Sequence, residues 1–186
     1  MTYLGKKAVH LVPAPKQANS KSDSVNTMAV LEDTDFKEGI IEADVAGAPR
    51  PGADESARGF VGIAFRLQRD DKTYECFYLR PTNGRAEDQL RRNHSTQYIS
   101  APEFPWYRLR AENPGVYESY VDLEPGSWTH VKIVAQGSKA RLFVNGSQQP
   151  TLIVNDLKQG DSRGKIALWI GSDSDAYFAN LTVAPP

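Results

Sequence analysis

The sequence predicts an all-β fold, an antiparallel β-sandwich of the jelly-roll type. Roughly ten to thirteen short segments alternate apolar and polar residues and are separated by Gly, Pro, Asn and Asp, which is typical of sandwiches and jelly rolls. No long stretch has the 3.6-residue period of an amphipathic helix. With 186 residues and 40% hydrophobic content, the chain suffices for one well-buried domain, and residues 1–186 are taken as that domain.

The stretch Gly59–Pro81 predicts a central hairpin. Val61–Leu67 alternates large and small side chains, and a second run, Tyr74–Arg80, follows a polar break at residues 69–72. Two period-2 runs joined by a short polar turn are typical of an antiparallel strand pair.

If the turn is centred in that break, Arg66 faces Glu75 on the sheet face that also carries Gly62 and Ala64. A charged pair among small side chains resembles the floor of a binding groove. The alternative is an ordinary cross-strand ion pair on a solvated sheet, which contributes little to stability. A register slip of one residue would break this pairing.

A second hairpin has a well-determined register. Trp128–Ala135 and Ala140–Asn145 flank Gly137 and Ser138, and a glycine suits the positive φ at the first central position of a type II′ turn. The apolar pairs expected on one face are Ala135 with Ala140, Ile133 with Leu142 and Val131 with Val144.

The other expected strands come from shorter runs. Residues 82–126 form a long, proline-rich connection that must contain short strands, because so long a loop is uncommon in a compact domain. Within it, only residues 85–92 retain a helical period. The expected strands are residues 7–12, 25–31, 40–45, 97–100, 106–111, 116–121, 151–154, 164–170 and 176–183.

Composition excludes several classes of function. The net charge of −1 and the pI near 6.3 give no general attraction to nucleic acid or to an anionic membrane. No apolar run approaches the length of about 18 residues that a membrane-spanning helix needs. A single cysteine, Cys76, excludes an internal disulfide and is interpreted as a packed apolar side chain. The N-terminus has no signal-peptide pattern, and a monomer is expected.

The candidate site combines the hairpin with the long connection. Sugars present apolar C–H faces and rings of hydroxyls, so a sugar site needs an aromatic side chain beside planar donors and acceptors. The predicted catalytic residues are Glu75, Arg66 and His94, and the predicted substrate-binding residues are Arg80, Gln97, Tyr98, Trp106, Tyr107 and Arg108.

Each of the main candidate residues has an expected chemical role. Arg66 would bind a hydroxyl pair or a uronate carboxylate, and Glu75 would orient it or act as general acid/base. His94 is the one histidine in a position to transfer a proton, and no histidine spacing supports a transition-metal site. Trp106 or Tyr98 would stack on a sugar ring, although Trp106 fits equally well as a plug over one end of the sandwich.

Four motifs resemble those of a known superfamily. The sequences WTHVKIV from Trp128, RLFVNG from Arg141, GKIALW from Gly164 and YFANL from Tyr177 resemble the laminin-G-like and concanavalin A-like jelly rolls. GIAFR from Gly62, followed by Tyr74-Glu75, is similar to the bacterial 3-keto-disaccharide hydrolase branch, also called laminarinase-like. The resemblance covers about residues 36–184.

The resemblance implies a secreted or periplasmic protein that handles an oligosaccharide or polysaccharide in a concave groove. It also implies no cofactor apart from a structural calcium ion, for which Asp173 and Asp175 are the candidate ligands.

The sequence departs from the glucanase pattern at one strand. Laminarinase-type glucanases carry Glu-x-Asp-x-x-Glu, whereas this chain has Glu42 and Asp44 without the third carboxylate. These two residues lie roughly 6.6 Å apart along an extended strand, which leaves chemistry possible but favours a structural strand. Three functions therefore stay open: a glycoside hydrolase or lyase, a non-catalytic carbohydrate-binding module, and a laminin-G-like protein-interaction domain.

Overall fold

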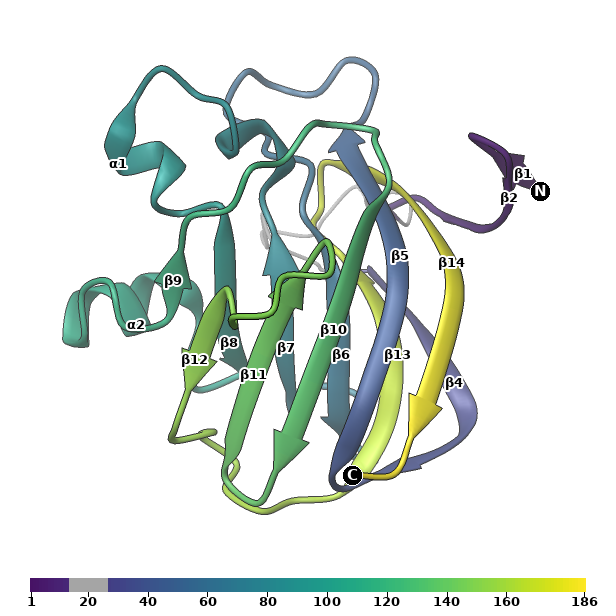
Figure 1. Cartoon of the computed structure of the whole chain (residues 1–186), viewed down its shortest axis with the longest axis vertical. Coiled ribbons are helices and arrows are strands. Elements are labelled where there is room, and N and C mark those ends of the chain that lie inside the picture. The colour runs from purple at the N-terminus through teal and green to yellow at the C-terminus, as the bar shows by residue number, and fades with distance from the viewer. Residues whose placement is uncertain (14–26) are drawn as a thin grey trace, which may run out of the picture.

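Two antiparallel six-stranded sheets face each other in a sandwich, and a two-stranded ribbon of β1 (Thr2–Tyr3) and β2 (Lys6–Lys7) lies beside them (Figure 1). The computed structural model describes residues 1–13 and 27–186. The sheet that we call the β5 sheet has, in spatial order, β12 (Leu152–Val154), β11 (Lys139–Val144), β10 (Thr129–Gln136), β5 (Gly39–Pro49), β14 (Ser174–Ala184) and β3 (Val9–Leu11). The β7 sheet has β4 (Thr27–Phe36), β13 (Gly164–Ile170), β6 (Val61–Leu67), β7 (Tyr74–Leu79), β8 (Thr96–Ala101) and β9 (Glu118–Ser119).

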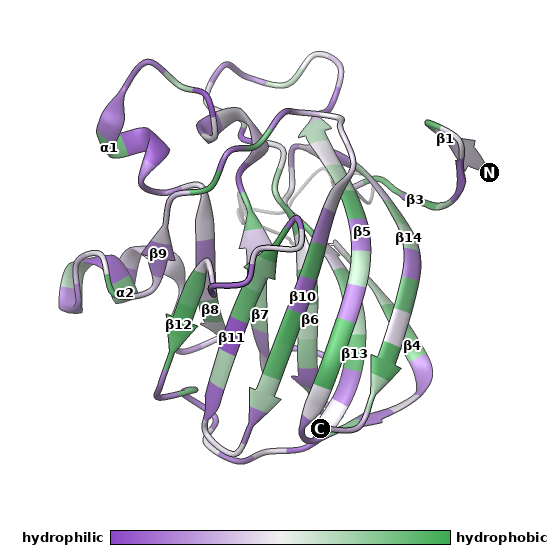
Figure 2. Ribbon diagram, in the orientation of Figure 1, coloured by the Kyte–Doolittle hydropathy of each residue, from purple (hydrophilic) through white to green (hydrophobic). Residues whose placement is uncertain are grey.

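The core lies between these sheets. Strand β10 alternates buried and partly exposed residues along its length. The hydropathy colouring alternates in the first half of β10, and most of the second half is hydrophobic (Figure 2). On β5, Gly47 approaches β6 so closely that a Cβ there would lie 2.7 Å from a methyl group of Val61. Val61 and the residues in step with it, Ile63 and Phe65, therefore face the β5 sheet. Cys76 is a buried free thiol, as predicted.

The predicted β10–β11 hairpin is confirmed. Val131 pairs with Val144, Ile133 with Leu142 and Ala135 with Ala140, and the turn glycine, Gly137, has a φ of 54°. The register is correct because a two-residue turn that requires glycine leaves a single alignment of the apolar faces.

The predicted register of the β6–β7 hairpin is wrong by one residue. Phe65, and not Arg66, lies opposite Glu75. Arg66 has a left-handed φ of 55° and lies where the pairing of β6 with β13 shifts, between Lys165 and Ala167. Such a bulge places one extra residue in the strand, so the alternation that the sequence suggests ends before Arg66. Glu75 consequently shares the inner face with Phe65.

Residues 106–111 form part of a helix and not the predicted strand. Helix α2 (Trp106–Glu112) begins after Pro105, buries Leu109 completely, and joins Arg108 to Glu112 by a 2.8 Å contact one turn apart. Because the segment buries only one side chain, it lacks the apolar face that a strand would need.

The other predicted elements are found with changed bounds. The expected helical period at 85–92 corresponds to α1 (Gln89–Arg92), which follows a 3₁₀ turn, η1 (Pro81–Asn83). The strand expected at 25–31 appears as β4, and its first two expected residues lie outside the described ranges. Within the described part of the chain, α2 is the longest helix at seven residues, and no helix there has the length and apolar character needed to cross a membrane.

Candidate functional site

Five residues form a row across the β7 sheet, on the face turned away from the β5 sheet. The strand register places Trp169, Gly62, Tyr78, Gln97 and Glu118 opposite one another in that order. A Cβ at Gly62 would lie 2.6 Å from the Cβ of Tyr78, so only glycine leaves room for Tyr78 to lean across β6. The Tyr78 ring thereby stacks on Trp169 with 4.7 Å between ring centroids.

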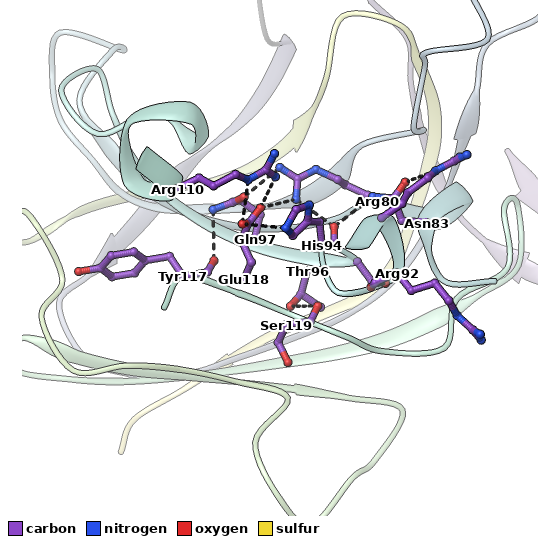
Figure 3. Close-up of polar contacts among 12 residues, drawn as sticks. Arg80, Asn83, Arg92, His94, Thr96, Gln97, Arg110, Tyr117, Glu118 and Ser119 are labelled. Carbon is purple, nitrogen blue, oxygen red and sulfur yellow. Dashed lines mark hydrogen bonds and ion pairs between the residues drawn. The ribbon is translucent and has the colours of Figure 1, made fainter. Parts of the chain in front are cut away.

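Arg80 lies above this row, one residue after β7 ends, and is almost completely buried. Its Nη2 donates to Tyr78 Oη at 3.0 Å and to Gln97 Oε1 at 2.9 Å. Its Nη1 donates to the backbone oxygen of His94 at 2.9 Å and to Glu118 Oε1 at 3.3 Å (Figure 3). These four acceptors fix the guanidinium, because its planar fork has to satisfy all of them at once.

Glu118 is held by arginines on both carboxylate oxygens. Arg110 Nε donates to Oε2 at 3.0 Å, and Arg110 Nη2 and Arg80 Nη1 both donate to Oε1. His94 Nε2 lies 3.5 Å from Oε2. Figure 3 shows the side chains of Arg80, Gln97, Arg110 and Glu118 converging at this point. The Glu118 side chain is only 2% exposed, so its negative charge is buried. The positive charges of Arg80 and Arg110 compensate it.

Burial and the neighbouring charges both act on the pKa of His94. Burial lowers the pKa of His94, and the positive charges of Arg110 and Arg80 lower it further, although Glu118 opposes them.

A pocket of about 500 Å³ opens beside this network, between the β5–β6 connection, α1 and α2. Trp106 is 40% exposed, and the Arg110 guanidinium lies 4.6 Å from the centre of its ring system. Four arginines and a single carboxylate are among the described residues that line the pocket, which makes its electrostatic character basic. The lining residues are Ser56, Arg58, Phe60, Arg80, Asn83, Asp88, Leu90, Arg91, His94, Trp106 and Arg110. We call this site the Arg80 pocket.

The structure brings together four of the predicted site residues. Arg80, His94 and Trp106 line the Arg80 pocket, and Gln97 supports it from beneath through its bond to Arg80. The other predicted site residues lie elsewhere.

Arg66 is fully buried and forms hydrogen bonds to three separate loops. Its guanidinium donates to the backbone oxygens of Lys37 at 2.7 and 2.9 Å, Gly160 at 2.6 Å and Gly137 at 2.7 Å. These bonds to main-chain acceptors account for a charged residue inside the fold, because a buried donor without a partner is costly.

Glu75 and Tyr98 form a hydrogen-bonded pair on the inner face. Tyr98 Oη donates to Glu75 Oε2 at 2.5 Å, and the backbone N–H of Gln159 donates to Oε1 at 2.8 Å. Neither side chain is exposed. Burial raises the pKa of the Glu75 carboxyl, an effect that these hydrogen bonds partly offset, and burial also raises the pKa of Tyr98.

Tyr107 and Arg108 lie on α2 beside the pocket without lining it. Tyr107 is 63% exposed and meets Trp106 edge to face. Arg108 bonds to Glu112 at 2.8 Å and to the backbone oxygen of Glu103 at 2.7 Å.

The two candidate calcium ligands each contact a basic side chain. Asp173 lies 3.2 Å from Arg50, and Asp175 lies 2.6 Å from His10. Among residues 1–13 and 27–186, no group of three or more His, Cys, Asp and Glu side chains is placed to hold a metal ion. Because Ca²⁺ takes six to eight oxygen ligands, these two carboxylates would need several backbone or water oxygens as well, and the calcium site stays a prediction.

Glu42 and Asp44 lie on β5, in the other sheet. His130 contacts both, at 3.3 Å from Glu42 and 3.0 Å from Asp44, and Lys6 pairs with Asp44 at 2.7 Å. These polar contacts agree with the structural interpretation of this strand.

The sequence did not predict several residues that line the pocket or support it. Glu118 lies in the expected strand 116–121, and pairing that strand with 97–100 would have placed Glu118 beside Gln97, as the structure does. Arg110 was obscured by the wrong strand prediction for 106–111. Arg58 lies in a segment without periodicity, and the helical period expected at 85–92 predicts a helix at Arg91 but no functional role for it.

Comparison with known proteins identifies the class. The two-sheet jelly roll, with its site at one end of the β7 sheet, is the concanavalin A-like fold. Residues 62–182 match the family Laminin_G_3, described as the concanavalin A-like lectin/glucanases superfamily, and the chain belongs to that family. No curated protein matches the sequence.

Two solved structures illustrate the similarity. The carbohydrate-binding module CBM66 from Bacillus subtilis superposes with a TM-score of 0.57 at 17% identity, over 88% of this chain and 83% of that one. A Bacillus subtilis protein with a galectin-like fold superposes with a TM-score of 0.59 at 13% identity, over 95% of this chain and 81% of that one. At these identities the likeness establishes the fold.

Proposed function

We propose that the protein is a carbohydrate-binding module whose ligand site is the Arg80 pocket. The observation that carries the proposal is an exposed tryptophan, Trp106, standing beside arginine guanidiniums in a pocket of about 500 Å³. An aromatic ring covers the C–H face of a sugar, while arginines donate paired hydrogen bonds to its oxygens. Most small-molecule sites combine apolar walls with a few such fixed polar groups.

The network beneath the pocket holds these groups in place before a ligand arrives. Glu118 orients Arg110 over Trp106, and Tyr78 and Gln97 orient Arg80. A site whose side chains are already fixed loses less conformational entropy on binding. The fold of a structure titled as a carbohydrate-binding module is compatible with this role.

Binding is better supported than hydrolysis. Glycoside hydrolysis ordinarily uses two carboxyl groups, one on either side of the scissile bond. Among the described lining residues, Asp88 is the one carboxylate, and its side chain already accepts the backbone N–H of Arg91 at 2.8 Å. Glu118 has both oxygens occupied by arginines.

One observation favours a lyase as a second candidate. His94 lines the pocket next to arginines, and its lowered pKa favours the unprotonated imidazole, which can accept a proton. A lyase would release unsaturated, ultraviolet-absorbing fragments from a uronate polymer, and His94→Ala would abolish that release. A binding module retains the polymer and releases nothing.

A glycan panel with matched variants tests the proposal. Wild type, Trp106→Ala and Tyr120→Ala are compared for retention on immobilised neutral and acidic glycans. Trp106 lines the pocket, whereas the exposed Tyr120 does not, so we expect Trp106→Ala to lower affinity by about tenfold or more and Tyr120→Ala to leave it unchanged. Absence of retention on every glycan, or equal losses in the two variants, would contradict a sugar site here and favour the protein-interaction alternative.

A further inference from the structure

We infer that the Arg80 pocket selects acidic glycans, and that Arg58 and Arg91 bind the carboxylate of a uronic acid residue. This inference rests on the proposed function and narrows it to one class of sugar. It starts from the uneven distribution of charge around the pocket.

Two of the four arginines form no ion pair with a carboxylate among the described residues. Glu118 compensates Arg80 and Arg110, as described above. Neither Arg58 nor Arg91 has a carboxylate oxygen within 4.0 Å among the described residues, whereas surface arginines such as Arg85 pair with Asp122 and Glu124. The whole chain carries a net charge of −1, so this local excess of positive charge is a property of the pocket and not of the protein.

Both guanidiniums are positioned by neutral groups that leave donors available. Arg58 uses Nη1 for the backbone oxygens of Glu55 at 2.8 Å and Ala57 at 3.2 Å, and its Nε and Nη2 have no partner among the described residues. Arg91 uses Nε for Asn83 Oδ1 at 2.9 Å and Nη2 for Thr82 at 3.0 Å, which leaves Nη1. Each half-buried side chain is therefore fixed by acceptors that do not cancel its charge.

The two charges are also close enough to affect each other. Burial lowers the pKa of Arg58, and the positive charges of Arg91 and Arg80 lower it further, while Asp54 opposes them. Like charges gathered in a partly buried site are unfavourable unless an anion joins them. A bound carboxylate would remove this repulsion and accept paired hydrogen bonds from a guanidinium.

The walls of the pocket indicate that the anion belongs to a sugar. Phe60, Leu90 and Trp106 line the same pocket, and Leu90 is 67% exposed. A free inorganic anion gains nothing from apolar walls, whereas a uronic acid presents a C–H face together with its carboxylate. A nucleic acid would require a wider basic surface than a chain with a pI near 6.3 provides.

The test compares each acid with its own neutral form. Oligomers of galacturonate, glucuronate and mannuronate are titrated against wild type, each beside its methyl ester, which keeps the ring and removes the charge. We expect at least one acid to bind about tenfold more tightly than its ester, because a charge-assisted hydrogen bond contributes about that much. Arg58→Gln and Arg91→Gln should each remove most of this preference, and Arg58→Lys should retain part of it.

Controls separate the inference from the proposed function. Arg85→Gln removes an exposed arginine outside the pocket and should leave the preference intact. If acids and esters bind equally well, the inference is overturned and a neutral-sugar site stands. If neither the uronic acids nor their esters bind while neutral glycans in the panel do, the inference is also overturned, but the proposed function stands. If a DNA oligonucleotide competes as well as the acid, or Arg85→Gln weakens binding as much as Arg58→Gln, the attraction is general and the inference fails.

Discussion

Arg80 Nη1 and Glu118 Oε1 lie 3.3 Å apart beneath the pocket, with side chains that are 5% and 2% exposed. Arg80 directly follows β7 and Glu118 lies on β9, with β8 between these two strands, so their contact depends on the strand order β7-β8-β9. The pair therefore connects the stability of the fold to the shape of the site.

Removing the charge of Glu118 should be strongly destabilising. Glu118→Gln leaves buried Arg80 without its counter-charge, and we expect the free energy of unfolding to fall by about 3–5 kcal/mol. Denaturant unfolding measures the change. The matched control is Glu112→Gln, whose exposed pair with Arg108 should contribute about 0.5 kcal/mol or less. Equal losses from the two substitutions would show that the buried Glu118 contributes no more to stability than the exposed Glu112.

Arg66 should matter for stability and not for ligand affinity. Arg66→Met removes the donors of three backbone carbonyls, and we expect a loss of about 2–4 kcal/mol in the free energy of unfolding. Arg163→Met, which removes an exposed pair with Asp35, serves as the control. A folded Arg66→Met protein with weakened glycan binding would instead support the groove-floor role that the sequence suggested.

Glu75 should make the protein less stable as the pH rises. Its folded pKa is raised above the ordinary value of 4.5, so between these two pKa values the folded state keeps a proton that the unfolded state has lost. Raising the pH through this window therefore favours unfolding, and the loss persists above the folded pKa.

The comparison of wild type with Glu75→Gln isolates this effect. The unfolding free energies of both proteins are measured at about pH 4 and about pH 8. Relative to wild type, Glu75→Gln should be more stable at the higher pH than at the lower pH, because the amide cannot ionise. Glu87→Gln, at an exposed position, is the matched control. A shift in the opposite direction would mean that Glu75 is stabilised as a carboxylate.

The sequence predicted the fold because the strand signals are local. The β10–β11 register follows from one glycine turn and the alternation on each side of it. The β6–β7 register failed because the bulge at Arg66 depends on main-chain acceptors far away in sequence, at Lys37, Gly137 and Gly160. A period-2 pattern contains no information about such partners.

The site was predicted only in part for a related reason. Arg80, His94, Gln97 and Trp106 lie in polar or aromatic stretches that suggest sugar binding by composition. Glu118 and Arg110 become functional candidates only once the order β7-β8-β9 and helix α2 are known. Arg58 enters the pocket from a connection whose path no residue pattern determines.

Tryptophan fluorescence tests the central claim most directly. Of the three tryptophans, Trp106 lines the Arg80 pocket, while Trp169 is buried at 2% exposure. Titrating the best-retained glycan should give a saturable change in emission for wild type that is lost in Trp106→Phe. A saturable change of equal size in Trp106→Phe, or tight binding that leaves the emission of Trp106 unaltered, would contradict the assignment of the glycan site to this pocket.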